Sequence, residues 1–384
     1  MISELWFPIR IVFGEGAIGE LPRELARLGV NKPLILTDKL LAKNGLLGRA
    51  TGALDGARVQ HAVFDEVDPD PTAATVDAGL ACYRETACDG LVALGGGSAI
   101  DTAKSVRLLT AHPPPLARYD AVVGGGRFIT NPMPPLVAIP TTAGTGSEVG
   151  WNLVVTLPET GRKTIISSPA LISSTAICDP ELTYGMPPWL TAGTGMDTLI
   201  HSLEALCARG FQPFADALAR KGLELCGRYL VRAVKDGKDA EARAAMMIAA
   251  VAGSTAYQKG LGPVHSLAHA LTPVSGVHHG IATAIVLPAV MEFNVAAAAA
   301  ELAEVAVALG EPASDDRDRL ARCAVSRVRA IARESGIPER LRDVGVKERQ
   351  IPVLMEKAFQ DGCHLANRRP CAPADLAAML RASF

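Results

Sequence analysis

The sequence predicts an α/β domain followed by an all-helical domain, and three observations carry this prediction. The chain has 384 residues, which indicates two domains at about 150 residues per domain. Up to residue 185, short apolar runs bounded by glycine and proline alternate with helical stretches, a pattern typical of a parallel sheet. After Pro187-Pro188 strand patterns nearly vanish and alanine-rich helical spacing takes over. We therefore expect an α/β domain over residues 1–185 and a helical domain over residues 186–384.

Three strands buried on both faces are expected in the first domain, because each is a short apolar run closed by glycine, proline or a polar residue. These runs are residues 33–38, 90–94 and 135–140. Helical stretches over 72–86 and 99–110 lie between them and predict right-handed crossovers. The second domain is expected to consist of helices over residues 191–208, 214–235, 239–258, 264–271, 280–290, 296–309, 315–334 and 347–359.

Composition and charge exclude several classes of protein. Hydrophobic residues make up 49% and charged residues 20%, as in a folded chain and unlike a disordered one. The net charge of -2 gives no reason to expect nucleic-acid or membrane-surface binding. No apolar run reaches the roughly 18 residues of a membrane helix, and the first residues do not resemble a secretory signal. The eight cysteines form no Cys-x-x-Cys pair, so we expect reduced thiols and a cytoplasmic protein.

A glycine-rich turn follows the strand expected at 90–94. It consists of Gly95, Gly96, Gly97 and Ser98 and precedes the helix expected at 99–110. Glycines let backbone N–H groups approach an anion, and a helix start adds unpaired donors. Ser98 is suited to cap this helix and to donate to a phosphate oxygen. The segment predicts a phosphate loop, and the alternative is a tight strand-to-helix turn.

Two further segments of the first domain have polar residues at strand ends. Asp38 ends the first expected strand, where an acid can accept from a ribose 2′-hydroxyl and repel a 2′-phosphate. Its alternative role is a helix N-cap. Residues 141–148 place hydroxyls and glycines after the third expected strand and could wrap a polar ligand. The alternative there is a solvated turn with a capping box from Thr145 to Glu148.

The helical half carries a cluster of potential metal ligands. Asp197 and His201 are four residues apart, on one face of an expected helix. His265 and His269 repeat this spacing, and His278-His279 follows beside another helix start. A single histidine of this kind is usually structural, but five of the eight histidines lie in these three groups. One acid with several imidazoles suits Fe²⁺ or Zn²⁺ with an open position, and no thiolate spacing points to a structural zinc site.

Taken together, these motifs resemble the iron-containing alcohol dehydrogenase family over nearly the whole chain. The lactaldehyde reductase and propanediol dehydrogenase branches look most similar. The segments that carry the resemblance are Gly95-Gly96-Gly97-Ser98, Pro140-Thr141-Thr142-Ala143-Gly144-Thr145, Gly195-Met196-Asp197 with His201, Gly262-Pro263-x-His265, and His279-Gly280.

The resemblance implies a dehydroquinate-synthase-like fold and a set of site residues. Asp197, His201, His265 and His279 match the metal-ligand positions, His269 matches a position near the nicotinamide that is a candidate for proton transfer, and His278 matches no ligand. Cys363 falls in a segment that lines the substrate pocket. The positions that match cofactor contacts are Asp38, Asp70 (where the family often has Asn), Gly95, Gly96, Gly97, Ser98, Ala99, Ile100, Thr141, Thr142, Thr145, Val154, Lys163, Leu182 and Met186.

The activity implied is NAD-dependent interconversion of a small alcohol and its aldehyde, with hydride transfer between the alcohol at the metal and the nicotinamide. The expected cofactors are NAD and Fe²⁺, with Zn²⁺ as the alternative metal. The resemblance also implies a homodimer or a higher homo-oligomer. Three related activities stay open as alternatives: a zinc-dependent glycerol dehydrogenase, a dehydroquinate-synthase-like enzyme and a maleylacetate reductase.

Overall fold

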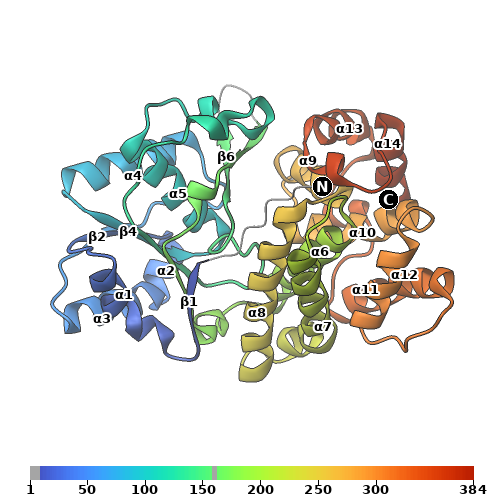
Figure 1. Ribbon diagram of the computed structural model, residues 1–384, viewed down its shortest axis with the longest axis horizontal. Helices are drawn as coiled ribbons and strands as arrows, with labels where there is room; N and C mark the ends of the chain where they lie inside the picture. The colour runs from blue at the N-terminus through green and yellow to red at the C-terminus, as the bar shows by residue number, and fades with distance from the viewer. Residues whose placement is uncertain (1–8, 158–161) are drawn as a thin grey trace. The chain divides into compact units, whose positions relative to one another are not determined.

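The computed structural model describes residues 9–157 and 162–384, which fall into two units (Figure 1). The α/β unit runs to Thr142 and continues over Gly146–Thr183. The helical unit holds Ala143–Thr145 and Tyr184–Phe384. A parallel sheet followed by helices is the predicted fold class, which the structure confirms.

A six-stranded sheet, in the order β1-β8-β5-β4-β2-β3, forms the centre of the α/β unit, and all its strand pairs are parallel. The three strands expected from the sequence correspond to β2, β4 and β5. The bounds of the six strands are β1 Arg10–Phe13, β2 Pro33–Leu36, β3 Ala62–Phe64, β4 Gly90–Gly95, β5 Leu136–Pro140 and β8 Thr175–Cys178.

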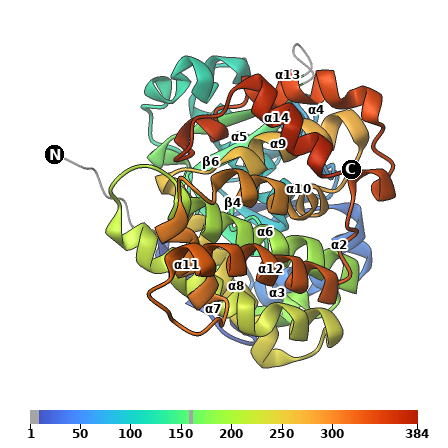
Figure 2. The same ribbon diagram turned by 90° about the vertical axis from the view of Figure 1, so that its right-hand side faces the viewer.

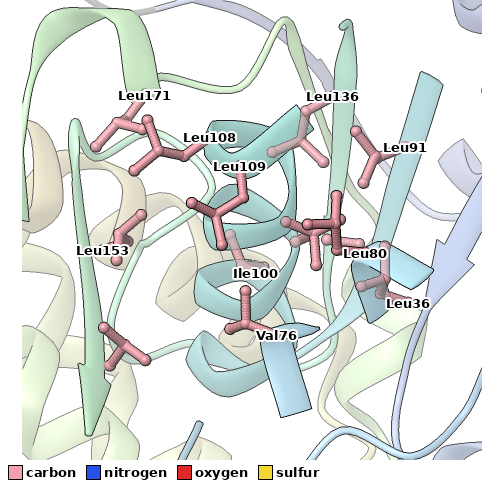
Figure 3. Close-up of a cluster of buried hydrophobic side chains, with 14 of the residues drawn as sticks. Leu36, Val76, Leu80, Leu91, Ile100, Leu108, Leu109, Leu136, Leu153 and Leu171 are labelled. Carbon is pink, nitrogen blue, oxygen red and sulfur yellow. The ribbon is translucent and has the colours of Figure 1, made fainter. Parts of the chain in front are cut away.

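Helices cover both faces of this sheet, which is why its central strands are apolar throughout. Alternate strand residues point to opposite faces. Leu91 and Ala93 of β4 join one buried cluster with α4 and α5 (Figure 3). Val92 and Leu94 join another with α1 and α3. The helices of this unit are α1 Leu21–Arg27, α2 Lys39–Lys43, α3 Leu46–Gly56, α4 Ala73–Glu85 and α5 Gly97–Ala111.

A two-stranded antiparallel hairpin was not expected from the sequence. It pairs β6 (Asn152–Leu157) with β7 (Arg162–Ser167). Leu153, Val155 and Leu157 alternate with less buried residues along β6 and join the cluster on the α4–α5 face of the sheet. That alternation is the usual mark of a half-buried strand, so the hairpin was detectable from the sequence.

The helical unit is organised around α6 (Pro188–Cys207), in which every residue from Gly195 to Cys207 is buried. It packs against α7, α8 and α10 (Figure 2). All eight expected helices are present with shifted ends, and α14 was not expected. The other helices are α7 Pro213–Lys235, α8 Ala240–Ala256, α9 Pro263–Ser275, α10 His279–Asn294, α11 Ala299–Ala308, α12 Arg317–Glu334, α13 Ile351–Gln360 and α14 Pro373–Ala382.

Two expectations from composition can be compared with this fold. All eight cysteines are free, as expected for reduced thiols. Among the described residues, no helix is both long enough and apolar enough to span a bilayer.

Candidate metal centre and cofactor loops

Four side chains from three helices converge in the helical unit. Asp197 and His201 lie one turn apart on α6, His265 lies on α9, and His279 is the first residue of α10. The Oδ1 atom of Asp197 lies 3.8 Å from Nε2 of His201, 3.7 Å from Nε2 of His265 and 3.5 Å from Nε2 of His279. The structure therefore brings together all four residues that the sequence predicts as metal ligands.

The convergent atoms fit a divalent cation. Metal–ligand bonds of about 2.1 Å in a tetrahedral site separate the ligand atoms by about 3.4 Å, close to the distances seen here. Asp197 Oδ1 and His265 Nε2 are buried and have no hydrogen-bond partner among the residues that the structure describes. Buried polar atoms are normally paired, so these two atoms point to a missing partner such as a metal ion.

The charge states of Asp197 and His201 also suit a metal. Burial raises the pKa of the Asp197 carboxyl, but the surrounding histidines outweigh it and hold the pKa far below its usual range. Burial lowers the pKa of His201 to about 4, although Asp197 opposes this shift. An ionised carboxylate and a neutral imidazole are the forms in which these residues bind metals.

A close helix crossing brings His279 to this cluster. A Cβ atom on Gly280 would lie 2.2 Å from the carbonyl oxygen of Gly193 on α6, so only glycine lets α10 approach this closely. The neighbouring His278 is exposed, and its ring packs edge-on against Trp189 with 5.6 Å between centroids. His279 thus joins the cluster around Asp197, whereas His278 does not.

His269 lies beside the cluster and is held by a half-buried acid, Asp361. Its Nδ1 atom is 2.9 Å from Oδ2 of Asp361, and its ring stacks on that of His279 at 5.3 Å between centroids. Asp361 also accepts from the Ser266 hydroxyl and from the Cys363 backbone N–H. Burial raises the pKa of the Cys363 thiol well above its usual value, which argues against a thiolate nucleophile at this position.

The glycine-rich turn joins β4 to α5 as expected, but Ser98 does not cap the helix. Gly96 is the N-cap residue, and the Ser98 hydroxyl donates to the Pro69 carbonyl at 2.6 Å. The prediction that Ser98 caps the helix is therefore wrong, because the helix begins two residues earlier than the sequence indicated. Ala99 and Ile100 are buried in the core, so only their backbone atoms remain for a ligand.

Gly95 and Gly96 are required by close packing around this turn. Gly95 has a φ of +154°, and a Cβ there would lie 2.6 Å from that of Ala99. A Cβ on Gly96 would lie 3.3 Å from Oγ1 of Thr142. The Thr141 N–H donates to the Gly95 carbonyl. The turn after β4 and the Thr141–Thr142 segment after β5 are thus neighbours at one edge of the sheet.

Asp38 is the N-cap of α2 and lies at the end of β2. Its Oδ1 atom accepts from the N–H groups of Leu40 at 2.8 Å and Leu41 at 2.9 Å. The structure thus shows the capping role that the sequence left open. Both hydrogen bonds use the same oxygen, so this role does not occupy Oδ2.

Asp70 and Lys163, which the resemblance places at the cofactor, form an ion pair at 3.0 Å. The Thr156 hydroxyl donates to Asp70, and the Val154 N–H donates to Asp101. These contacts link the β6–β7 hairpin to the residues preceding α4 and to α5.

The remaining predicted cofactor positions lie in both units. Leu182 is buried in the core of the α/β unit, whereas Met186 lies in the helical unit and accepts from Arg243. Thr145 is half-buried in the short segment that belongs to the helical unit. Ser147 and Glu148, which follow, are buried, so the alternative of a solvated turn over 141–148 is wrong.

Glu204 is a functional candidate that the sequence reasoning missed. It is buried on α6 and lies 2.6 Å from Nδ1 of His265. Asp197, His201 and Glu204 occupy positions i, i+4 and i+7 of one helix, which places them on one face. Extending the helical spacing by one turn would have found it.

A glycine-rich loop on a parallel sheet and a carboxylate–histidine cluster among helices are features of a metal-containing dehydrogenase. Comparison with known proteins supports this class. The family model for iron-containing alcohol dehydrogenase matches residues 8–180, and the model for the C-terminal part of the same family matches residues 191–384.

Individual relatives match over nearly the full length. The 4-hydroxybutyrate dehydrogenase of Cupriavidus necator is 41% identical over 96% of each chain. The lactaldehyde reductase of Escherichia coli K12 is 38% identical over 95% of each chain, and the NAD-dependent methanol dehydrogenase of Bacillus methanolicus is 35% identical over 99% of each. A crystal structure of 1,3-propanediol oxidoreductase superposes with a TM-score of 0.96 at 36% identity over 100% of both chains.

The chain belongs to the iron-containing alcohol dehydrogenase family, and it is an oxidoreductase. The resemblance drawn from the sequence motifs is confirmed, including its likeness to the lactaldehyde reductase branch.

Proposed function

We propose that the chain is an NAD-dependent alcohol dehydrogenase or aldehyde reductase. In this proposal Asp197, His201, His265 and His279 hold one divalent metal ion. When bound, the metal supplies Lewis acidity at the oxygen of the alcohol or aldehyde, and NAD supplies the hydride acceptor or donor. The observation that carries the proposal is the convergence of three histidine side chains on one buried carboxylate oxygen, Asp197 Oδ1.

The donor set fits both candidate metals. One carboxylate and three imidazoles suit Fe²⁺ and Zn²⁺ alike, and the general order of metal affinities favours zinc over iron. Iron is the metal in the family's name. We propose Fe²⁺ with Zn²⁺ as the alternative, to be decided by metal analysis of anaerobically purified protein.

His269 is the chain's candidate for moving a proton. The Asp361 carboxylate accepts from Nδ1 of His269, so Nδ1 carries a hydrogen and Nε2 is the nitrogen that can exchange a proton with substrate or water. An imidazole titrates nearest to neutral pH among the side chains, which suits a proton relay. Its stacking on His279 places it next to the proposed metal ligands.

The turn from Gly95 to Ser98 and the start of α5 are proposed to hold the cofactor phosphates. The first N–H groups of a helix have no partner within the helix and carry the positive end of its dipole. Thr141, Thr142 and Thr145 add hydroxyl groups, and Asp38 Oδ2 is proposed to accept from the ribose. The other proposed cofactor positions are Asp70, Val154, Lys163, Leu182 and Met186.

The substrate is proposed to be a small alcohol or aldehyde. The relatives are named for a hydroxy acid, methanol and lactaldehyde, all small hydroxyl or carbonyl compounds. Cys363 lies within reach of His269 and Asp361 and is proposed as a wall of the substrate pocket. We further propose a cytoplasmic homodimer or higher homo-oligomer with no nucleic-acid or membrane partner, and light scattering would determine the assembly.

Two histidine variants, His279→Ala and His265→Ala, test the metal site. His279→Ala should lose the bound metal and NADH formation at 340 nm, because it removes one of four ligands. His278→Ala is the matched control, since this neighbouring histidine is exposed and packs on Trp189. His265→Ala should behave like His279→Ala while still binding NAD in a fluorescence titration, because the proposed phosphate loop belongs to the α/β unit.

Full turnover by His265→Ala after loss of its metal would refute the proposal.

Wild-type protein with a panel of small alcohols should form NADH in proportion to product. A dehydroquinate-synthase-like enzyme would instead show no net NADH, since it uses NAD only transiently.

A further inference from the structure

Glu204 is an acid enclosed behind the proposed metal cluster. Glu204 is 4% exposed, and its carboxylate accepts three hydrogen bonds. Its Oε1 atom accepts from the Val264 N–H at 2.8 Å, and its Oε2 atom accepts from the Gly262 N–H at 2.9 Å and from Nδ1 of His265 at 2.6 Å. These donors are at the start of α9, so Glu204 binds α6 to the helix end that carries His265.

The glycine at position 262 makes room for this carboxylate. A Cβ there would lie 2.5 Å from Oε1 of Glu204. The φ of Gly262 is −145°, an extended conformation that any residue adopts, so its backbone does not require glycine. The Gly262-Pro263-x-His265 motif therefore gives the Glu204 carboxylate access to His265.

The hydrogen bond from His265 sets the tautomer of its ring. An ionised carboxylate only accepts, so Nδ1 must carry the hydrogen and Nε2 is left with a lone pair. That Nε2 atom lies 3.7 Å from Asp197 Oδ1 and has no hydrogen-bond partner within the described part of the chain. Glu204 thus aims the metal-binding nitrogen of His265 at the cluster.

The charge of Glu204 also matters at this site. Two carboxylates flank the His265 ring, with Asp197 Oδ1 at 3.7 Å from Nε2 and Glu204 Oε2 at 2.6 Å from Nδ1. The same two negative charges would favour a cation in the cluster. Three neutral imidazoles and two carboxylates balance a divalent ion, whereas Asp197 alone would leave one positive charge buried.

We propose that Glu204 is a positioning residue that fixes the Nε2-binding form of His265 and supplies the second negative charge that the metal requires. The proposal rests on the proposed metal site. Carboxylates that orient a metal-binding histidine contribute about 10- to 100-fold to metal affinity.

The test is Glu204→Gln, which keeps the shape of the side chain and removes its charge. Metal-free variant and wild-type protein are titrated with Zn²⁺ against a competing chelator, and with Co²⁺ to record its visible absorption spectrum. We expect the Kd for zinc to rise about 10- to 100-fold and the cobalt spectrum at saturation to shift, because the ligand field of His265 changes. Glu304→Gln is the control: this acid pairs with Arg220 on the surface and should change neither quantity.

An unchanged Kd would overturn the proposal. A weaker Kd with an unchanged cobalt spectrum would overturn the positioning role, since Glu204 would then act on the metal through its charge alone. The His265→Ala variant distinguishes a failure of the positioning role from a failure of the proposed function. If His265→Ala binds zinc with the wild-type Kd, the proposed metal site itself is wrong. If Glu204→Gln binds zinc with the wild-type Kd and His265→Ala does not, the positioning role is wrong. Should Glu204→Gln not fold, Gly262→Ala displaces the carboxylate without removing its charge, with the same expected changes.

Discussion

At the scale of single residues, Lys104 and Glu148 are ionisable side chains buried in the α/β unit. The Lys104 ammonium donates to the carbonyl oxygens of Ser147, Gly150 and Asn152 and to the Ser147 hydroxyl. Burial lowers the pKa of Lys104 to about 8 and raises the pKa of Glu148 to about 7. No pattern in the sequence distinguishes these charged residues from surface ones, because their burial depends on the tertiary fold.

Glu148 should make stability depend on pH. Its pKa is higher in the folded chain than the usual 4.5, so the folded state binds the proton more tightly, and stability falls as pH rises from about 4.5 through 7. Glu148→Gln removes this dependence. The stability of the variant relative to the wild type should rise by about 2 kcal/mol between pH 5 and pH 8, measured by denaturant unfolding. A constant difference across that range would show that Glu148 has an ordinary pKa.

Asp38 should determine the choice between NAD and NADP. Its carboxylate caps α2 through Oδ1, and Asn caps a helix about as well as Asp. Asp38→Asn therefore removes the charge and keeps the cap. We expect the ratio of kcat/KM for NAD over NADP to fall about tenfold, equivalent to about 1.4 kcal/mol, with Tm unchanged. A wild-type preference for NADP would refute the assignment.

At the scale of elements, the position of His279 depends on how closely α10 crosses α6. The sequence indicated both helices but not their crossing, since contact between Gly280 and Gly193 is a property of two segments far apart in the chain. The contact between Glu204 and Gly262 could not be predicted from the sequence for the same reason. Position 262 needs a glycine only because the Glu204 side chain from α6 reaches it. Motif spacing identified the ligands, and the structure explains the glycines beside them.

Gly280→Ala should therefore move α10 away from α6. Its Cβ would meet backbone atoms of Gly193 that cannot rotate away. Overpacking of this kind costs about 1–3 kcal/mol, and the shift of α10 should weaken metal binding by moving His279. Thermal unfolding and metal analysis would measure both effects. Gly362→Ala is the control, because a Cβ there meets nothing within 4 Å. Wild-type metal content in Gly280→Ala would contradict this view of the crossing.

At the scale of the whole molecule, alternation of short strands and helices was enough to predict the parallel sheet and the helical half. Strands β1, β3 and β8 were missed because each has only three or four residues, and the β6–β7 hairpin was missed although its alternation is visible in the sequence. Asp361 was missed as the partner of His269 because the two residues are 92 positions apart. Long-range pairs of this kind follow from packing and not from local spacing.

The central claim is that one divalent cation is held by Asp197, His201, His265 and His279 within the helical unit. Anomalous X-ray diffraction from crystals grown with Fe²⁺ or Zn²⁺, recorded at the absorption edge of that metal, tests it most directly. We predict a single peak at about 2.0–2.2 Å from Asp197 Oδ1 and from Nε2 of each of the three histidines. A peak elsewhere, or the four side chains turned apart with the metal present, would contradict the claim.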